Sequence, residues 1–213
     1  MERTLSSKLT ITGTVSLAAV IIFNVLIFQY TSLYQAMVPQ KVSAQPATTN
    51  NNFLTYNNPT YKIKMQYPPD WTVSTNTLQT YSGVVAFYSP LQSLTDVLPA
   101  ELSLSITTYS KGVSLDEYTK TTLAALDQQG IKVSESNAFT LAGKPGHRIV
   151  FSPPPPQPPQ NNNQGDPQVS ISIMQAWTTI GSKVYLISYS AEESKFQKYL
   201  PTVERMLNSL QIQ

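Results

Sequence analysis

The sequence predicts an α+β fold in which a mostly antiparallel β-sheet is flanked by helices. Residues 61–67 and 102–107 alternate apolar and polar side chains, which is typical of strands with one face on a core. Residues 114–130 and 196–210 instead place apolar side chains at helical spacing. Because short turns such as Thr179–Ser182 join neighbouring strands, we expect the sheet to be largely antiparallel.

The strands are predicted from alternation and from short apolar runs between turn residues. They are expected at residues 61–67, 84–88, 102–107, 131–137, 139–142, 147–151, 169–177 and 184–189. Gly143–Gly146 is predicted to turn the chain between two of these strands, and Thr179–Ser182 is predicted to close a hairpin.

Two helices are predicted, each with a recognisable boundary. Ser114 and Glu117 have the spacing of a capping box, and Gly130 is placed to end the first helix in a left-handed conformation. The second helix carries its apolar face on Phe196, Tyr199, Leu200, Val203, Leu207 and Leu210. Because proline cannot donate to the carbonyl four residues back, we expect this helix to break near Leu200, with Pro201 in the first turn of the final segment.

The composition excludes several function classes. The chain has 213 residues, a formal net charge of +2 and scattered Lys and Arg, so it lacks the basic patch that nucleic-acid binding requires. It has no cysteine, which excludes thiol nucleophiles, disulfides and cysteine-ligated metals. His147 is the only histidine, so a multi-histidine zinc site is excluded and any catalytic triad would have to use that residue.

The amino-terminal region reads as a membrane anchor. Residues 11–30 form an uncharged, largely apolar segment of nearly bilayer-spanning length, and residues 1–10 carry Arg3 and Lys8. The positive-inside rule then puts residues 1–10 in the cytoplasm and the rest of the chain outside, as a single-pass protein of the cell membrane. The alternative is a signal peptide cleaved near Val42–Ala44, which leads to the same export.

Beyond the anchor, residues 31–52 are predicted to be a flexible linker, and residues 53–213 form one domain. Inside that domain, residues 152–168 are rich in proline, asparagine and glutamine and are predicted to be a disordered loop. An inert insertion between strands is one interpretation of this loop. A proline-rich docking peptide for a partner with an aromatic groove is the other.

Four local motifs, taken in order, resemble the PsbP-type domain family over Phe53–Ile212. These are the Pro68–Trp71 turn after the first strand, the Leu141–Pro145 segment before another strand, the hairpin through Gly181–Leu186, and a final amphipathic helix ending at Asn208–Ile212. The resemblance implies an α/β/α sandwich around an antiparallel sheet.

The same resemblance implies a function. Plant and cyanobacterial members are extrinsic lumenal proteins that support the oxygen-evolving complex of photosystem II and its retention of calcium and chloride, and a related eukaryotic branch binds the small GTPase Ran. The common theme is docking through a surface rather than an active site. Fold transfers between such distant proteins better than function does, so the photosystem role is not carried over.

Individual residues give few candidates for chemistry. His147 lies after a turn and is interpreted as a surface or edge histidine rather than a general base, because no Gly-x-Ser-x-Gly motif supplies a hydroxyl. The acidic pairs Asp116–Glu117 and Glu192–Glu193 lie at predicted helix starts, where negative charge favours the helix dipole. Trp71 and Trp177 are interpreted as core residues. We therefore predict no catalytic residue and no metal ligand.

The sequence thus favours a non-enzymatic accessory protein. It would be anchored in the membrane through residues 11–30, would dock on a membrane or envelope complex through its exported, monomeric domain, and would bind no nucleic acid. The alternative is a carrier or sensor domain for a small molecule or an ion, with calcium suggested only by the family resemblance. A hydrolase is the third candidate.

Overall fold

The structure is a computed structural model that describes residues 52–75, 83–93, 96–154 and 169–213. The elements of the amino-terminal part are β1 (Leu54–Asn58), β2 (Ile63–Tyr67), β3 (Thr72–Ser74), β4 (Gly83–Tyr88), β5 (Glu101–Thr108) and α2 (Leu115–Gln128). The carboxyl-terminal part contains β6 (Val133–Leu141), β7 (Lys144–Phe151), β8 (Ile171–Ile180), β9 (Lys183–Glu192), α3 (Glu193–Asn208) and β10 (Gln211–Ile212).

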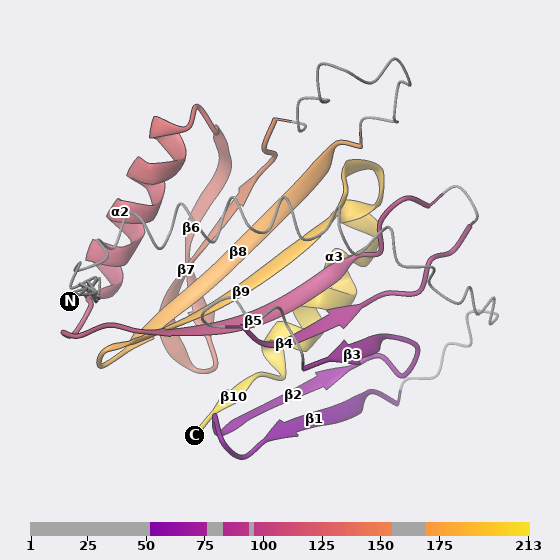
Figure 1. The fold of residues 1–213 in the computed structure, drawn as a ribbon, viewed down its shortest axis with the longest axis horizontal. Helices are drawn as coiled ribbons and strands as arrows, with labels where there is room; N and C mark the ends of the chain where they lie inside the picture. Colours follow the sequence, from indigo (N-terminus) through magenta and orange to yellow (C-terminus); the bar gives the residue numbers. More distant parts are fainter. Residues whose placement is uncertain (1–51, 76–82, 94–95, 155–168) are drawn as a thin grey trace, which may run out of the picture.

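A seven-stranded sheet dominates the fold (Figure 1). Its strand order is β3-β4-β5-β9-β8-β7-β6, and every neighbouring pair is antiparallel. The predicted α+β class with a mostly antiparallel sheet is confirmed. A second, three-stranded sheet in the order β1-β2-β10 was not predicted; in Figure 1 it lies below β3 and β4.

Helices cover both faces of the large sheet, as the α/β/α prediction required. Ile173 and Met174 are adjacent on β8, so they point to opposite faces, and each belongs to a different apolar cluster. Met174 lies in the cluster that includes Phe196 of α3, whereas Ile173 lies in the cluster that includes Leu126 of α2. Each helix therefore buries its apolar stripe against its own side of the sheet.

Helix α2 begins and ends where the sequence indicated. The Ser114 hydroxyl oxygen accepts a hydrogen bond from the Glu117 amide at 3.1 Å, which satisfies one of the unpaired amides of the first turn. Beyond the helix, Gly130 has a φ of +70° and its amide donates to the Asp127 carbonyl. Both boundary predictions are confirmed.

The predicted break in the last helix is wrong. Helix α3 runs without interruption from Glu193 to Asn208, with Pro201 inside it. Pro201 is exposed, so the carbonyl that loses its amide partner can be hydrated, and the opposite face remains intact. The buried side of that face consists of Phe196, Tyr199, Val203, Met206 and Leu207. Packing of the apolar stripe outweighs the local cost of the proline.

The turn between β6 and β7 is shorter than predicted. Leu141 pairs with Lys144, so the connection consists of Ala142 and Gly143, with φ values of 51° and 72°. Two consecutive residues with positive φ are the signature of a tight turn that matches the twist of a hairpin. Residues 133–141 form one strand rather than two, and Lys144 through Gly146 belong to β7 instead of the turn.

Some predictions fall outside the described residues. These are the anchor at 11–30, nearly all of the linker at 31–52, and most of the proline-rich loop, from residue 155 onward. Among the residues that the structure does describe, no helix has the length and apolarity needed to cross a bilayer.

Candidate docking surface

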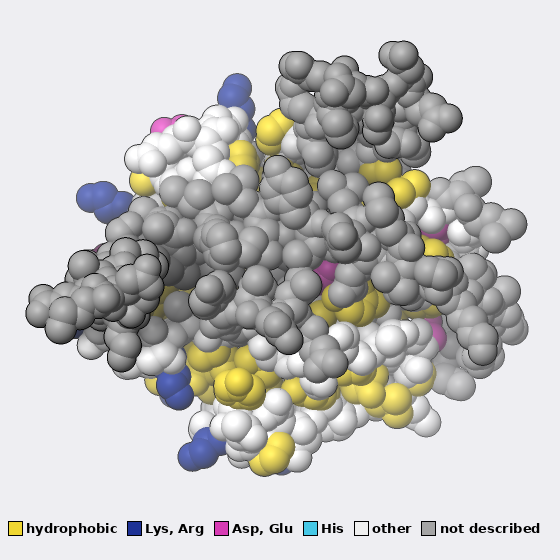
Figure 2. All heavy atoms as spheres, in the orientation of Figure 1, with side chains coloured by type: hydrophobic (Ala, Val, Ile, Leu, Met, Phe, Trp, Pro, Cys, Tyr) yellow, Lys and Arg dark blue, Asp and Glu magenta, His cyan; other side chains and the backbone are white. Residues whose placement is uncertain are grey.

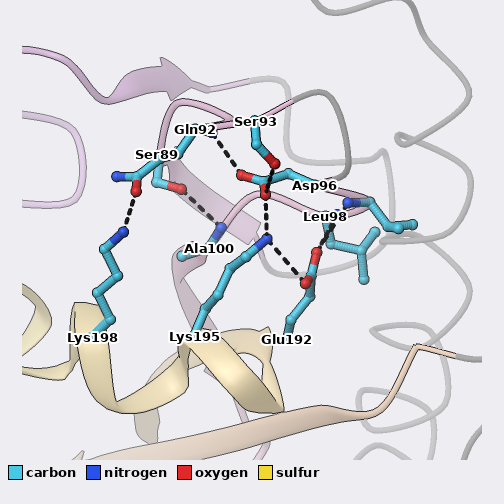
Figure 3. A network of polar contacts seen from close by, with 10 residues as sticks. Ser89, Gln92, Ser93, Asp96, Leu98, Ala100, Glu192, Lys195 and Lys198 are labelled. Atoms are coloured by element: carbon cyan, nitrogen blue, oxygen red, sulfur yellow. Dashed lines mark hydrogen bonds and ion pairs between the residues drawn. The ribbon is translucent and has the colours of Figure 1, made fainter. Parts of the chain in front are cut away.

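The loop that joins β4 to β5 lies against the amino-terminal turn of α3 (Figure 3). Its base is closed by two hydrogen bonds: the Ser89 amide donates to the Ala100 carbonyl at 2.8 Å, and the Ala100 amide donates to the Ser89 hydroxyl at 2.9 Å. Ser89 and Ala100 are both buried. The loop therefore leaves the sheet and returns to it through a fixed, desolvated neck.

Glu192, the residue that precedes α3, holds the far side of this loop. Its Oε1 accepts hydrogen bonds from the consecutive amides of Val97 and Leu98, each at 3.0 Å, although these residues are more than ninety positions away in sequence. Its Oε2 lies 3.0 Å from Lys195 Nζ. One carboxylate thus fixes two neighbouring backbone amides and a cation, in a site where its side chain is only 13% exposed.

Lys195 links this carboxylate to a second one. Its ammonium lies 2.8 Å from Asp96 Oδ1, which also accepts from the Ser93 hydroxyl at 2.7 Å. Asp96 Oδ2 accepts from the Gln92 amide at 2.6 Å. Figure 3 shows these side chains converging from the loop above and α3 below, with Lys198 of α3 donating to the Gln92 side chain.

The electrostatics keep Asp96 and Lys195 ionised. Burial alone raises the pKa of Asp96, but hydrogen bonds from Lys195, Ser93 and the Gln92 amide, with the charge of Lys195, hold it well below its usual range. For Lys195 burial favours the neutral form, yet its two carboxylate partners raise its pKa above the ordinary value. Asp96 consequently acts as a permanent acceptor for Lys195, and the arrangement is suited to fixing a loop.

The network presents one apolar side chain to solvent. Val97 is 37% exposed, while its amide is held by Glu192 and the next side chain, Leu98, is buried. We call residues 96–98 together with Lys195 and Lys198 the clipped surface. It combines an exposed hydrophobic residue with flanking charges on a backbone whose conformation is fixed, which is suited to docking a partner.

His147 is partly exposed, in agreement with the surface interpretation, but it does not lie at an edge of the sheet. It lies within β7, between β6 and β8, and its ring packs on Trp177 with centroids 5.5 Å apart. Its Nε2 lies 2.9 Å from the Ser136 hydroxyl, a contact that could not be predicted from the sequence. In the described part of the chain, no carboxylate is recorded against this histidine to orient it, and burial lowers its pKa.

The two acidic pairs lie on opposite faces of the sheet. Asp116 and Glu117 occupy the first turn of α2, as predicted. Glu193 occupies the first turn of α3, but Glu192 precedes that helix and holds the β4–β5 loop instead of capping the helix. Across the described ranges, no cluster of three or more acidic, histidine or cysteine side chains is placed to hold a metal ion.

The tryptophans are core residues, as predicted. Trp71 is 6% exposed and meets Tyr199 edge-on at 6.0 Å between ring centroids. Trp177 is fully buried, and its indole N–H donates to the Thr119 hydroxyl at 3.1 Å.

Sequence reasoning missed Asp96 and Lys195 entirely. One signal was available: the helix start at Glu192 has no Ser, Thr, Asp or Asn in the capping position, and its side chain makes no capping hydrogen bond. An acidic residue in that position is free to bind elsewhere. The sequence could not show where, because the partners come from a distant loop.

Comparison with known proteins supports the fold. No family model and no curated protein matches the sequence. Among solved structures, the cyanobacterial PsbP protein of Synechocystis aligns with a TM-score of 0.51 at 10% identity, covering 81% of this chain and 99% of that one. LpqN of Mycobacterium tuberculosis, described as involved in cell envelope biogenesis, also has a TM-score of 0.51, at 12% identity, covering 76% and 90%.

A weaker likeness, with a TM-score of 0.49, links the chain to the Ran-binding protein Mog1p of Saccharomyces cerevisiae at 9% identity, with 76% and 95% of the two chains covered. The chain has the PsbP-like α/β fold, as the resemblance in its sequence implied. At these identities the likeness concerns the fold alone, so the function has to be argued from the surface.

Proposed function

We propose that this chain is a membrane-anchored, extracytoplasmic accessory protein that docks on a membrane or envelope partner through the clipped surface and performs no catalysis. The observation that carries the proposal is the fixation of the Val97 and Leu98 amides by Glu192, which holds these two residues in one conformation.

A fixed loop favours recognition for an energetic reason. Ordering a free loop on binding costs conformational entropy, at about 0.5–1.5 kcal/mol for each immobilised side chain. In the clipped surface that cost has already been met during folding, because Lys195 ties Asp96 and Glu192 together. Val97 then supplies apolar area, and Lys195, which pairs with the same Glu192 carboxylate that holds the Val97 amide, supplies a polar neighbour.

Two observations support the membrane setting. Residues 11–30 contain no charged side chain and have nearly the length of a bilayer-spanning helix. The fold is shared with LpqN, which is described as acting in cell envelope biogenesis.

The anchor is tested by extraction and proteolysis. The full chain is expected to stay with the membrane in alkaline carbonate, and protease added to intact cells is expected to digest residues 53–213. Complete release of an uncleaved chain into the soluble fraction would contradict the anchor.

The clipped surface is tested by site-specific photo-crosslinking in native membranes. The photoreactive residue p-benzoylphenylalanine replaces Val97 in one variant and Gln128, an exposed residue at the end of α2, in the control. We expect a discrete adduct from position 97 only, and a weaker adduct when Glu192→Ala is added. Equal adducts from both positions, or none from position 97, would refute docking at this surface.

A further inference from the structure

The three-stranded sheet has an outward face of polar and basic side chains. Ile63 and Met65 of β2 are buried in the core, so the alternating Lys64 and Gln66 point away from it. Thr55 and Gln211 lie beside them, because Thr55 pairs with Gln66 and Gln211 pairs with Lys64. Thr55, Gln66 and Gln211 are exposed and Lys64 is half-buried.

This face borders an open hollow of about 520 Å³ where α3 ends. Its floor is fixed by Ser209, whose hydroxyl accepts from the Gln66 amide at 2.8 Å and donates to the Met206 carbonyl at 2.7 Å. The lining comprises Thr55, Lys64, Met65, Gln66, Arg205, Asn208, Ser209 and Gln211. Hydroxyl and amide donors thus surround two cationic side chains, a combination that suits a phosphate group.

The charge of this end has one sign. Residues 53–67 and 206–213 contain no acidic side chain, while Lys62, Lys64 and Arg205 are basic. The neighbouring Glu204 is paired with Arg148 at 3.5 Å. In the view of Figure 2, Lys or Arg and hydrophobic side chains reach the surface at the lower end of the molecule, and no acidic side chain of the described residues is visible there.

An exposed aromatic residue lies beside the basic face. Of the three large hydrophobic residues that are most exposed in the described chain, Tyr61, at 45%, is in the turn between β1 and β2, whereas Leu54, at 46%, pairs with Tyr67 and so points to the face of the sheet opposite Thr55. Tyr61 lies at the tip of the β1–β2 hairpin, where its amide donates to the Asn58 side chain at 3.2 Å. Aromatic side chains beside cations are typical of surfaces that lie at a lipid headgroup layer.

We infer that this face, defined as Tyr61, Lys62, Lys64 and Arg205 around the hollow, lies against an anionic phospholipid bilayer. The inference rests on the proposed anchor, because the tether of residues 31–52 enters the domain directly before Leu54. If it is flexible, as the sequence predicts, a tether of that length has an end-to-end distance of about 26 Å. The basic face is therefore held near the headgroups, and a weak affinity suffices to keep it there.

The charges alone would also suit a soluble phosphate. A soluble anion would use only the hollow, whereas a bilayer also contacts Tyr61 at the hairpin tip. The exposed Tyr61 and the entry point of the tether favour the bilayer.

The absence of cysteine permits a direct test in the full chain. Thr60→Cys at the hairpin tip and Gln128→Cys at the end of α2 each receive a nitroxide label, and both positions are exposed. The labelled chains are reconstituted into vesicles of phosphatidylcholine alone or mixed with phosphatidylglycerol. The accessibility of each nitroxide to oxygen, which is concentrated in lipid, and to a water-soluble nickel chelate is then measured. The ratio of the two accessibilities shows whether the label lies in lipid or in water. We expect the position 60 label to lose contact with the nickel chelate only in anionic vesicles, and the position 128 label to stay in water.

Matched charge variants establish the cause. The double variant Lys62→Gln with Lys64→Gln should bind anionic vesicles about 25-fold more weakly, or about fivefold per charge removed. Added salt should also weaken binding of the unaltered chain, because it screens the charges. Lys120→Gln with Lys132→Gln removes the same charge from exposed positions near α2 and should have no effect. A thermal melt of each variant verifies that it is folded.

Three outcomes would overturn the inference: equal contact in neutral and anionic vesicles, equal loss from both double variants, or displacement of the position 60 label from lipid by glycerol 3-phosphate, which would identify a soluble ligand. Failure of the anchor is recognised separately, since carbonate would then release the chain. Flotation of the released chain with anionic vesicles still decides whether the basic face binds them.

Discussion

The clip made by Glu192 can be tested by removing one side chain. In the Glu192→Ala variant the Val97 and Leu98 amides lose their acceptor, and Lys195 keeps only Asp96. The partly buried Leu98 amide costs about 1–3 kcal/mol when it is left unpaired. The exposed Val97 hydrogen bond adds about 0.5–1.5 kcal/mol, and the ion pair adds at most about 1 kcal/mol. Since these contributions share one side chain and are not additive, we expect a loss of about 2–4 kcal/mol.

Two neighbouring variants serve as controls for this magnitude. Glu192→Gln keeps a carbonyl oxygen for both amides and loses only the charge, so it should cost about 1 kcal/mol. Glu193→Ala removes an exposed acidic residue from the first turn of the same helix and should cost at most about 1 kcal/mol. We therefore expect Glu192→Ala to destabilise the fold clearly more than either Glu192→Gln or Glu193→Ala.

Urea unfolding of the full chain measures these losses, and hydrogen exchange locates them. In Glu192→Ala the Val97 and Leu98 amides should exchange much faster, while the Ser89 and Ala100 amides at the neck of the loop remain protected. The reasoning is refuted if Glu192→Ala costs no more than Glu193→Ala, or if the exchange of the two amides is unchanged.

Three further predictions concern other parts of the fold. Burial lowers the pKa of His147 below its ordinary value of 6.5, so the imidazole binds a proton more tightly in the unfolded chain than in the folded one. The free energy of unfolding should therefore fall as the pH drops below 6.5. Urea unfolding midpoints measured above and below that pH should differ, and His147→Gln should reduce the difference. Gly146→Ala should cost about 1–3 kcal/mol or more, since the added Cβ would lie 2.5 Å from the Trp177 carbonyl oxygen, whereas Gly112→Ala, with a 3.6 Å contact, should be nearly neutral in the same assay. Pro201→Ala should raise the free energy of unfolding by about 1–3 kcal/mol, because it restores a hydrogen bond in a continuous helix; a neutral or destabilising result would instead favour a break near Leu200.

The parts of the fold that could be predicted from sequence are those with long periodic segments. Residues 102–107 alternate because β5 has a core face, and Leu102 and Leu104 are indeed buried. β3 and β10 were missed because they have only three and two residues, too few for a period to emerge, whereas β1 is as long as β2 but has no buried side chain. β10 exists through its pairing with β2, nearly 150 residues away in the chain, so its cause lies in tertiary structure.

Pro201 shows why a correct local rule gave a wrong element. The rule considers the hydrogen bond that proline removes, but it does not consider whether that hydrogen bond is on the buried or the exposed side of the helix. In α3 the proline faces solvent, while Val203 and Met206 remain packed in the core. The sequence contains both the proline and the apolar stripe that continues across it. The apolar stripe was the better predictor of the helix.

The clipped surface depends on contacts between segments that are far apart in the sequence, which a local sequence pattern does not reveal. A carboxylate at the start of a helix has a ready local explanation in the helix dipole, and that explanation was adopted for both Glu192 and Glu193. Glu193 fits it, whereas Glu192 turns to the Val97 and Leu98 amides, because β9 and β5 are neighbours and bring the β4–β5 loop to that helix end. Two adjacent residues of one type thus have separate roles. Only the strand order of the sheet distinguishes them, so a candidate surface in this fold has to be sought where loops meet helix ends across the sheet.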